Sequence, residues 1–287
     1  MALPSHPPGV VPAGPPDIDM QVQPAEFRHI ADLLEAQFGI QLLDKQLLVT
    51  NRLLRLVRSS GHDSFHSWYQ EKMRRPTEAT IGELVDRLST NHTYFWREPE
   101  HFKFFRDVVV PDVAASAGRD LRVWCAAAAT GEEPYTLALL QRQVLGDDYR
   151  SWSAGLLATD ISSRALSIAR AGRYRADDVA RLPPELQGEF RPDGEEFMTV
   201  SNDVRADVTY RRFNLLAERM PFRAQFHAVF CRNVMIYFDE RIRKTLVQRL
   251  CDITAAGGYL VVGHAETIGH GIPNLTYLKP GIYRKVV

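Results

Sequence analysis

The sequence predicts an α/β protein in two folded parts, a small all-helical unit followed by a larger unit built on an open, mostly parallel sheet. Apolar residues recur at helical spacing between Pro24 and Leu88, whereas after Leu121 short strand-like runs alternate with helical ones. The segment 121–135, LRVWCAAAATGEEPY, combines a buried strand, a turn of small residues and a helix start near Glu132. Doubly wound sheets present ligands in this way, at the carboxyl end of the first strand.

Composition limits the classes of function. The chain has 287 residues, of which 45% are hydrophobic, with 35 basic and 35 acidic side chains. This neutral balance offers no overall field for a polyanion and disfavours nucleic-acid binding. Cys125, Cys231 and Cys251 are far apart, which predicts buried thiols in a reducing cytoplasm. No segment suggests membrane insertion or secretion, and without an unusually apolar face we expect a cytoplasmic monomer.

The first ninety residues predict a tail and a helical domain. Residues 1–20 hold six prolines within the first sixteen positions, which favours a disordered tail. Residues 21–90 predict four helices: one from Pro24 to a stop at Gly39, one over 44–59, one capped near Asp63 or Ser64, and one ending near Leu88.

The second of these helices has a basic face. Arg52, Arg55 and Arg58 lie opposite its apolar arc, and residues 45–75 carry a net charge of plus five. Such a run is commonly a solvated face, but it also suits docking to an acidic protein surface. His62 and His66 lie four residues apart without a third ligand, so we predict no metal site.

Residues 91–100 predict a linker that also acts as a lid. Aromatic residues here accompany Asn91, Thr93 and Arg97, which suits hydrogen bonding and a fixed positive charge beside a planar ligand. Packing between domains explains the aromatic residues equally well.

The turn after the first strand is acidic. A phosphate-binding turn has several glycines and no anion nearby, whereas Gly131 is followed by Glu132 and Glu133. The pair suits a cationic nucleoside such as S-adenosylmethionine, which carries a sulfonium and an ammonium group. Alternatively, the two carboxylates only complement the helix dipole, worth about 0.3–1 kcal/mol each. Asp160, at the end of the second strand, stands where Rossmann-like proteins hold ribose hydroxyls.

Residues 101–287 predict one sheet-based domain with an insertion. A helix is expected over 163–171, and residues 174–212, including FMTV and DVTYRRF, predict an inserted antiparallel β subdomain. A buried strand over 226–231 then ends at Arg232 and Asn233, followed by a helix over 241–254 and a strand over 259–262. The chain closes on a hairpin turning at Pro280-Gly281, which is typical of S-adenosylmethionine-dependent methyltransferases.

Four ordered motifs together resemble one family. Residues 91–98 (NHTYFWRE), 129–135 (ATGEEPY), 159–161 (TDI) and 231–238 (CRNVMIYF) are similar to the CheR-type chemotaxis receptor protein-glutamate O-methyltransferases, over about residues 24–286. The resemblance implies a Rossmann-like S-adenosylmethionine-dependent methyltransferase domain with a small antiparallel β insertion, preceded by an all-helical domain.

The resemblance also implies roles for individual residues. Arg97 and Tyr237 are expected near the transferred methyl group, and the basic face of Arg52, Arg55 and Arg58 is expected to meet the receptor's helical bundle. The expected cofactor contacts are Asn91, Thr93, Arg97, Glu133, Asp160, Asn214, Leu215, Arg232 and Asn233.

The implied reaction transfers a methyl group from S-adenosylmethionine to glutamate side chains on the cytoplasmic helices of methyl-accepting chemotaxis receptors, leaving S-adenosylhomocysteine. Because a carboxylate is already a nucleophile, positioning replaces a strong base. Trp96 is larger than the Phe expected there. Only six residues separate Phe190 from Phe197, which predicts independence from a C-terminal receptor pentapeptide tether.

The sequence disfavours three other functions. A nicotinamide-dependent oxidoreductase is disfavoured by the acidic, glycine-poor turn. A non-catalytic S-adenosylmethionine-binding regulatory or adaptor protein is weakened by the presence of both Arg97 and Tyr237. A nucleic-acid methyltransferase is disfavoured by the neutral charge.

Overall fold

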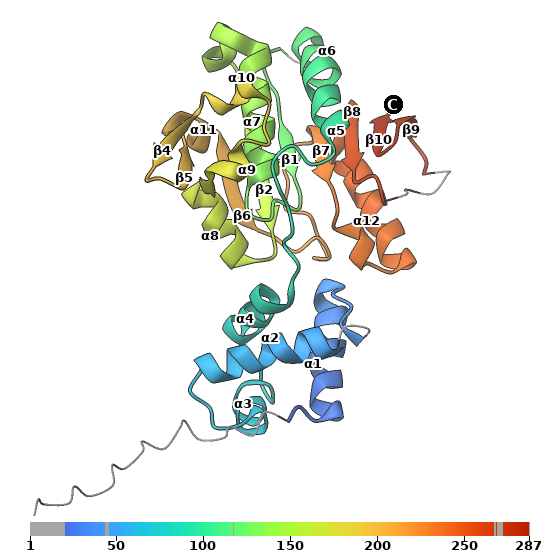
Figure 1. Cartoon of the computed structure of the whole chain (residues 1–287). Helices are drawn as coiled ribbons and strands as arrows, with labels where there is room; N and C mark the ends of the chain where they lie inside the picture. Colours follow the sequence, from blue (N-terminus) through green and yellow to red (C-terminus); the bar gives the residue numbers. More distant parts are fainter. Residues whose placement is uncertain (1–20, 44–45, 117, 267, 269–271, 287) are drawn as a thin grey trace, which may run out of the picture.

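The computed structural model describes residues 21–43, 46–116, 118–266, 268 and 272–286. The segment 1–20, predicted to be a disordered tail, lies outside the described residues, as do Asp44 and Lys45. Figure 1 shows a helical unit (blue to teal) joined by one extended segment to a larger unit built on a sheet. None of the helices in the described residues has the length and apolar character that crossing a membrane requires.

The helical unit consists of α1 (Pro24–Phe38), α2 (Gln46–Ser59), α3 (Phe65–Lys72) and α4 (Glu78–Leu88). Local signals explain their ends. Gly39 ends α1 in the left-handed region, at φ 67°, where glycine carries no steric penalty. The hydroxyl oxygens of Ser64 and Thr77 accept hydrogen bonds from the N–H groups of Ser67 and Thr80, and so cap α3 and α4.

These helices share an apolar core of their own. Leu53, Leu56 and Val57 of α2 are fully buried in it with Trp68 and Leu84, as the helical spacing predicts. Burying an aliphatic side chain of this size stabilises the fold by about 1.5–3 kcal/mol. The helical unit therefore has a packing basis separate from that of the sheet.

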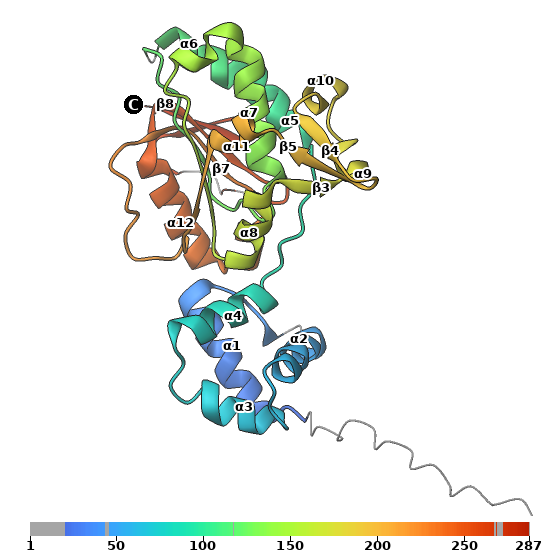
Figure 2. The same cartoon turned by 90° about the vertical axis from the view of Figure 1, so that its left-hand side faces the viewer.

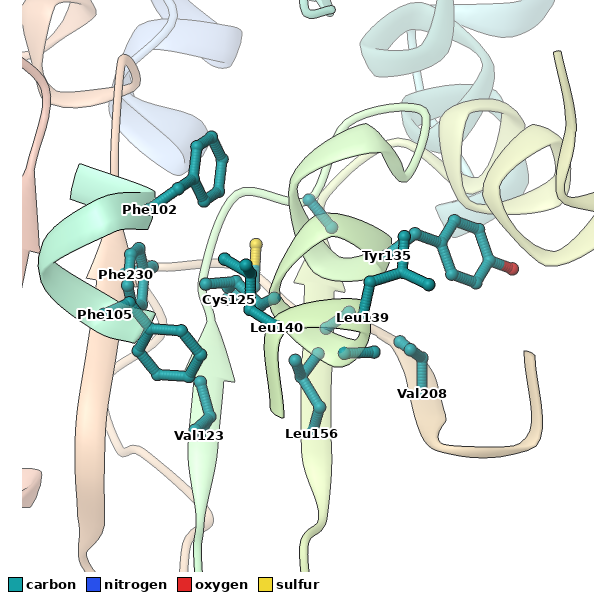
Figure 3. Close-up of a cluster of buried hydrophobic side chains, with 14 of the residues drawn as sticks. Phe102, Phe105, Val123, Cys125, Tyr135, Leu139, Leu140, Leu156, Val208 and Phe230 are labelled. Atoms are coloured by element: carbon teal, nitrogen blue, oxygen red, sulfur yellow. The ribbon is translucent and has the colours of Figure 1, made fainter. Parts of the chain in front are cut away.

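A helical run that was not predicted begins in the last two residues of the predicted linker, at Pro99. It comprises α5 (Pro99–Phe104), a π-helical turn η2 (Phe105–Val109) and α6 (Val110–Ser116). Its buried side chains, among them Phe102 and Phe105, cover one face of the sheet. Figure 3 shows the ring of Phe105 beside that of Phe230, which belongs to the central strand β7 (Phe226–Cys231).

The main sheet has seven strands in the order β6-β2-β1-β7-β8-β10-β9. The strands are β1 (Val123–Cys125), β2 (Leu156–Asp160), β6 (Val208–Arg212), β7 (Phe226–Cys231), β8 (Thr254–Val262), β9 (Leu275–Lys279) and β10 (Ile282–Lys285). The first five pair in parallel, and the hairpin β9–β10 adds two antiparallel strands at one edge. The predicted α/β fold with a terminal hairpin at Pro280-Gly281 is confirmed.

Helices cover both faces of this sheet, as Figures 1 and 2 show. They are α7 (Glu132–Leu145), α8 (Ser163–Ala171) and α12 (Glu240–Ile253). Successive side chains of β1 point to opposite faces, so Val123 and Cys125 join one apolar cluster and Trp124 the other. The three cysteines are free and buried, as predicted.

The inserted subdomain is smaller than predicted. Its three-stranded antiparallel sheet contains β3 (Arg173–Arg175), β4 (Phe190–Asp193) and β5 (Phe197–Val200), accompanied by α9 (Ala176–Val179), α10 (Pro184–Gln187) and α11 (Asn202–Ala206). The assignment of DVTYRRF to this insertion was wrong, because β6 pairs in parallel with β2 in the main sheet. As an edge strand, β6 buries only alternate residues, a pattern that sequence reading cannot separate from an antiparallel hairpin strand.

Candidate active site

A cavity lies at the carboxyl ends of β1, β2 and β7, where the sheet faces the helical unit. It spans about 1230 Å³, part of which is open to solvent. All nine predicted cofactor contacts line it, together with Tyr237 and Arg52. The sequence motifs that lie far apart along the chain thus converge on one space.

The turn after β1 brings backbone close to this cavity. Ala129 and Gly131 both adopt positive φ, 46° and 101°. A side chain at Gly131 would lie 2.7 Å from the hydroxyl of Tyr174 and 2.8 Å from Ala169, so only glycine fits there. Gly131 therefore serves the close packing of the turn, whereas Ala129 lines the cavity.

Asp160 ties the end of β2 to this turn. One of its carboxylate oxygens accepts a hydrogen bond from the Ala129 N–H at 2.8 Å, and the other accepts one from the Ser162 N–H at 2.9 Å. Burial raises the pKa of Asp160, while these N–H groups oppose the rise. A carboxylate has about four acceptor positions, and Asp160 lines the cavity, so it can also receive hydroxyl groups of a ligand.

The two adjacent glutamates of the turn have different surroundings. Glu132 is buried at the start of α7, bonded to the Thr130 hydroxyl, and burial raises its pKa. Glu133 lines the cavity and accepts hydrogen bonds from the Cys125 thiol and from Arg232. The helix-dipole explanation therefore suits Glu132, and the ligand explanation suits Glu133.

Arg232 is buried between two carboxylates, with 4% of its surface exposed. Its guanidinium donates to Glu133, to Glu98 at 3.0 Å and to the carbonyl of Arg97 at 2.6 Å. Burial disfavours its charge, but Glu133 and Glu98 outweigh this and raise the pKa of Arg232. Its positive charge is thus neutralised inside the protein, and Arg232 positions Glu133 and the linker.

Sequence reasoning missed Glu98. Its carboxylate accepts from Arg232, from the Asn233 amide at 3.0 Å and from the His264 N–H at 3.3 Å. Burial alone would raise the pKa of Glu98, but the Asn233 amide and Arg232 prevail and lower it. Its neighbour His101 is fully buried, and its Nε2 lies 3.1 Å from the carbonyl of Pro280.

Glu266, also missed, fixes the loop after β7. Its carboxylate accepts from the N–H groups of Asn233 at 2.7 Å, Met235 at 2.6 Å and Gly263 at 2.6 Å. Asn233 itself has a φ of 57°, a left-handed conformation that this anchoring maintains. The sequence signal that could have identified Glu266 is its position, as an acidic residue soon after the apolar strand β8.

The linker residues lie over the same cavity. The Asn91 side chain accepts from the Ser89 hydroxyl at 3.0 Å, and Arg97 donates to the carbonyl of His92 at 2.9 Å. Trp96 stacks on Phe102 with centroids 5.3 Å apart and does not line the cavity. The larger aromatic residue at 96 is therefore accommodated against α5.

On the opposite wall, the Asn214 amide donates to the carbonyl of Gln37 at 2.9 Å, which links this wall to the end of α1. Leu215 is buried beside it, and Tyr237 is half-buried on the short helix η4 (Met235–Tyr237). Both line the cavity.

The three arginines of the predicted docking face differ in position. Arg52 donates to the carbonyls of Leu88 and Ser89 at 3.1 and 3.4 Å, and so caps the end of α4. Arg55 and Arg58 are exposed.

Among the described residues, Glu98, His101 and His264 have potential metal-ligand atoms within 4.8 Å of one another. The Glu98 carboxylate in this group already accepts from Arg232 and Asn233. The group is therefore part of the hydrogen-bond network described above.

Comparison with known proteins identifies the family. Residues 91–279 match the family model described as CheR methyltransferase, SAM binding domain. The chemotaxis protein methyltransferase of Borreliella burgdorferi is 33% identical over 275 residues, 94% of this chain and 97% of the relative. That of Escherichia coli is 35% identical over 251 residues, 86% of this chain and 85% of the relative. The probable chemotaxis protein methyltransferase of Rhizobium etli is 34% identical over 258 residues, 84% and 95% of the two chains.

The match spans more than half of the chain, and each of these relatives is aligned over most of its own length as well. The resemblance inferred from four motifs is thereby confirmed, and the chain belongs to the CheR methyltransferase family.

Proposed function

We propose that this protein methylates glutamate side chains on the cytoplasmic helices of methyl-accepting chemotaxis receptors. S-adenosylmethionine is the methyl donor, and the products are a glutamate methyl ester and S-adenosylhomocysteine. The observation that carries the proposal is the convergence of the nine predicted cofactor contacts and Tyr237 on one cavity in a chain of this family.

The residues of the cavity fit S-adenosylmethionine. When bound, the cofactor supplies a methyl group activated by a positively charged sulfonium. The Glu133 carboxylate provides negative charge for a cationic ligand, and the small side chains of Ala126, Ala127 and Ala129 line the cavity without filling it. The remaining acceptor positions of Asp160 suit ribose hydroxyl groups.

The other predicted cofactor contacts lie on different walls of the cavity. Asn91 and Thr93 belong to the linker side, Asn214 and Leu215 to the side of α1, and Asn233 to the loop after β7. We assign these side chains to holding the nucleoside and the amino-acid part of the cofactor. Arg232 acts through Glu133 and Glu98 rather than through a free charge.

Arg97 and Tyr237 are the candidates for orienting the acceptor carboxylate. Both line the cavity from different elements, the linker and η4. Aiming one carboxylate oxygen at the reacting carbon and excluding water lowers the barrier without a general base. Arg55 and Arg58 are exposed, which suits contact with an acidic helical surface, and Arg52 connects that face to the cavity.

Several further expectations belong to the same proposal. We assign residues 21–90 to a helical domain, 91–100 to a linker and lid, and 101–287 to the methyltransferase domain. The separate apolar cores support this division. We also expect a cytoplasmic monomer that needs no receptor pentapeptide tether, since β4 and β5 are joined by only three residues, Gly194 to Glu196.

Calorimetric titration with S-adenosylmethionine and S-adenosylhomocysteine tests the cofactor site. We expect binding by wild type and a loss of about tenfold or more in Asp160→Asn, because the amide presents one acceptor oxygen instead of two. Asp148→Asn, an exposed carboxylate in the turn before β2, is the matched control and should bind as wild type does. Absence of binding by wild type would refute the proposal.

A further inference from the structure

A second cavity lies beside the first, between the helical unit and the sheet-based unit. It spans about 810 Å³, including open solvent, and is lined by residues of α2, α4 and α8. Figures 1 and 2 both show α4 next to the end of α8. The two cavities share Arg52, Ser89 and Asn91, so they meet at the start of the linker.

The second cavity is basic. Four arginines line it, and one of them, Arg52, donates to the carbonyls of Leu88 and Ser89. The other three are Arg55 of α2, Arg87 of α4 and Arg164 of α8, and within the described part of the chain no carboxylate lies within ion-pair distance of their guanidinium groups. We call these three residues and the space between them the basic groove. Three cations around one space repel one another, and an anion placed there relieves that repulsion.

One carboxylate, Asp86, also lines the groove, but it is engaged with α8. Its Oδ1 accepts from the Ser162 hydroxyl at 2.7 Å and from the Arg164 N–H at 3.2 Å. Asp86 thereby holds α4 against the first turn of α8 and fixes the distance between the walls that carry Arg87 and Arg164. Its charge is directed to these donors, which leaves the three guanidinium groups for an outside ligand.

We propose that the basic groove binds a second acidic side chain of the receptor segment whose glutamate is being methylated. This inference rests on the proposed function and extends the docking surface from α2 to Arg87 and Arg164. On a helical substrate, side chains three or four positions apart lie on one face, about 5–6 Å from each other. Because the cavities share a wall, one segment can place its acceptor in the first and a neighbouring carboxylate in the second.

This contact determines which receptor glutamates are methylated. Arg87 and Arg164 select glutamates that have an acidic neighbour on the same helical face, while Arg97 and Tyr237 orient the acceptor itself. Electrostatic contacts of this exposed kind act on encounter and register more than on the chemical step.

Charge reversal tests the proposal. In Arg87→Glu and Arg164→Glu, kcat/KM for the cytoplasmic fragment of a chemoreceptor from the same organism should fall by about tenfold or more, mainly through KM. Affinity for S-adenosylhomocysteine should stay within about twofold of wild type, which also verifies folding. Arg150→Glu, an exposed reversal remote from both cavities, is the control for net charge and should change neither quantity.

A complementary change in the substrate identifies the partner group. Acidic residues flanking each acceptor glutamate are replaced by Lys one at a time, and one such fragment should be a poor substrate for wild type and a better one for Arg164→Glu. If both reversals behave like Arg150→Glu, the proposal is wrong while the proposed function stands, since wild type still transfers methyl groups. If wild type methylates no fragment, the proposed function itself has failed.

Inorganic phosphate separates a substrate groove from a small-anion site. If the groove binds the receptor, phosphate should inhibit methyl transfer only by competing with the receptor fragment. Phosphate binding that Arg164→Glu abolishes, with kcat/KM for the receptor unchanged, would overturn it.

Discussion

At the scale of single residues, the buried Arg232 lies between two carboxylates at the wall of the cavity. It was predicted to contact the cofactor from its position after a buried strand, and it does line the cavity. Its partners Glu98 and Glu133 were not predictable as partners, because Arg232 follows them by 134 and 99 positions. Sequence motifs mark residues at strand ends, whereas hydrogen bonds across the fold depend on topology.

Removing this cation should destabilise the protein. Arg232→Met leaves the half-buried carboxylates of Glu98 and Glu133 without a counter-charge, so we expect the free energy of unfolding to fall by about 3–5 kcal/mol. Arg232→Lys, which keeps the charge but not the forked geometry, should lose less. Urea denaturation measures both, with Arg150→Met as control. A loss below about 1 kcal/mol in Arg232→Met would show that the network contributes little.

A second single residue, His101, makes the stability of the folded protein depend on pH. Burial, with the Arg232 charge next in importance, lowers the pKa of His101 to about 4. The unfolded chain therefore takes up this proton near its ordinary pKa of about 6.5, whereas the folded protein does so only near the lower value. The unfolded state binds more protons between these values, and stability falls as pH falls through that window.

Between about pH 7.5 and pH 5, this single group should cost about 2 kcal/mol of unfolding free energy. His101→Gln does not titrate and keeps an N–H donor for the carbonyl of Pro280, so it should show a shallower dependence. Urea denaturation at the two pH values compares the proteins. Parallel pH profiles for wild type and variant would contradict the assignment.

At the scale of elements, helices and strands with a regular spacing of apolar residues were predicted, whereas two elements that lack a clear pattern were missed or misplaced. The strand over 226–231 and the helix over 163–171 agree with the structure to the residue. The run α5–η2–α6 was missed because its apolar residues surround a π-helical turn, which breaks the usual spacing. The strand β6 was misplaced because strand pattern alone does not say which sheet a strand joins.

The loop from Arg232 to Tyr237 depends on one distant carboxylate. Glu266→Gln keeps the size of the side chain but replaces an acceptor oxygen with a donor, and three backbone N–H groups then compete for one oxygen. We expect a loss of about 1–3 kcal/mol in stability and weaker binding of S-adenosylhomocysteine. Thermal unfolding and calorimetry test this, with the exposed Glu240→Gln as control. Unchanged cofactor affinity would mean that the loop holds its shape without Glu266.

At the scale of the whole molecule, the cavity exists because two units meet. The helical unit contributes the Gln37 carbonyl to Asn214 and the Asp86 carboxylate to α8, and its residues Phe38 and Arg52 line the cavity. Sequence reasoning predicted both units and the linker. It did not predict these contacts, because they depend on how the two units pack.

The small insertion carries a prediction about substrates. The short β4–β5 turn leads us to expect that receptors with and without their C-terminal tail peptide are methylated with equal kcat/KM. Transfer assays on paired receptor fragments, identical except for the tail, make the comparison. A loss of about tenfold or more on removing the tail would establish a tether.

The most direct test of the account is transfer of a labelled methyl group from S-adenosylmethionine to a chemoreceptor cytoplasmic fragment, followed by mild alkaline hydrolysis. A glutamate methyl ester releases its label as volatile methanol, whereas methylated nitrogen keeps it. We predict label on the receptor that mild base releases, and about a tenth of that label or less when Asp160→Asn replaces wild type at subsaturating S-adenosylmethionine. Label that resists base, or no transfer to any receptor of the organism, would contradict the assignment of this protein as a receptor glutamate methyltransferase.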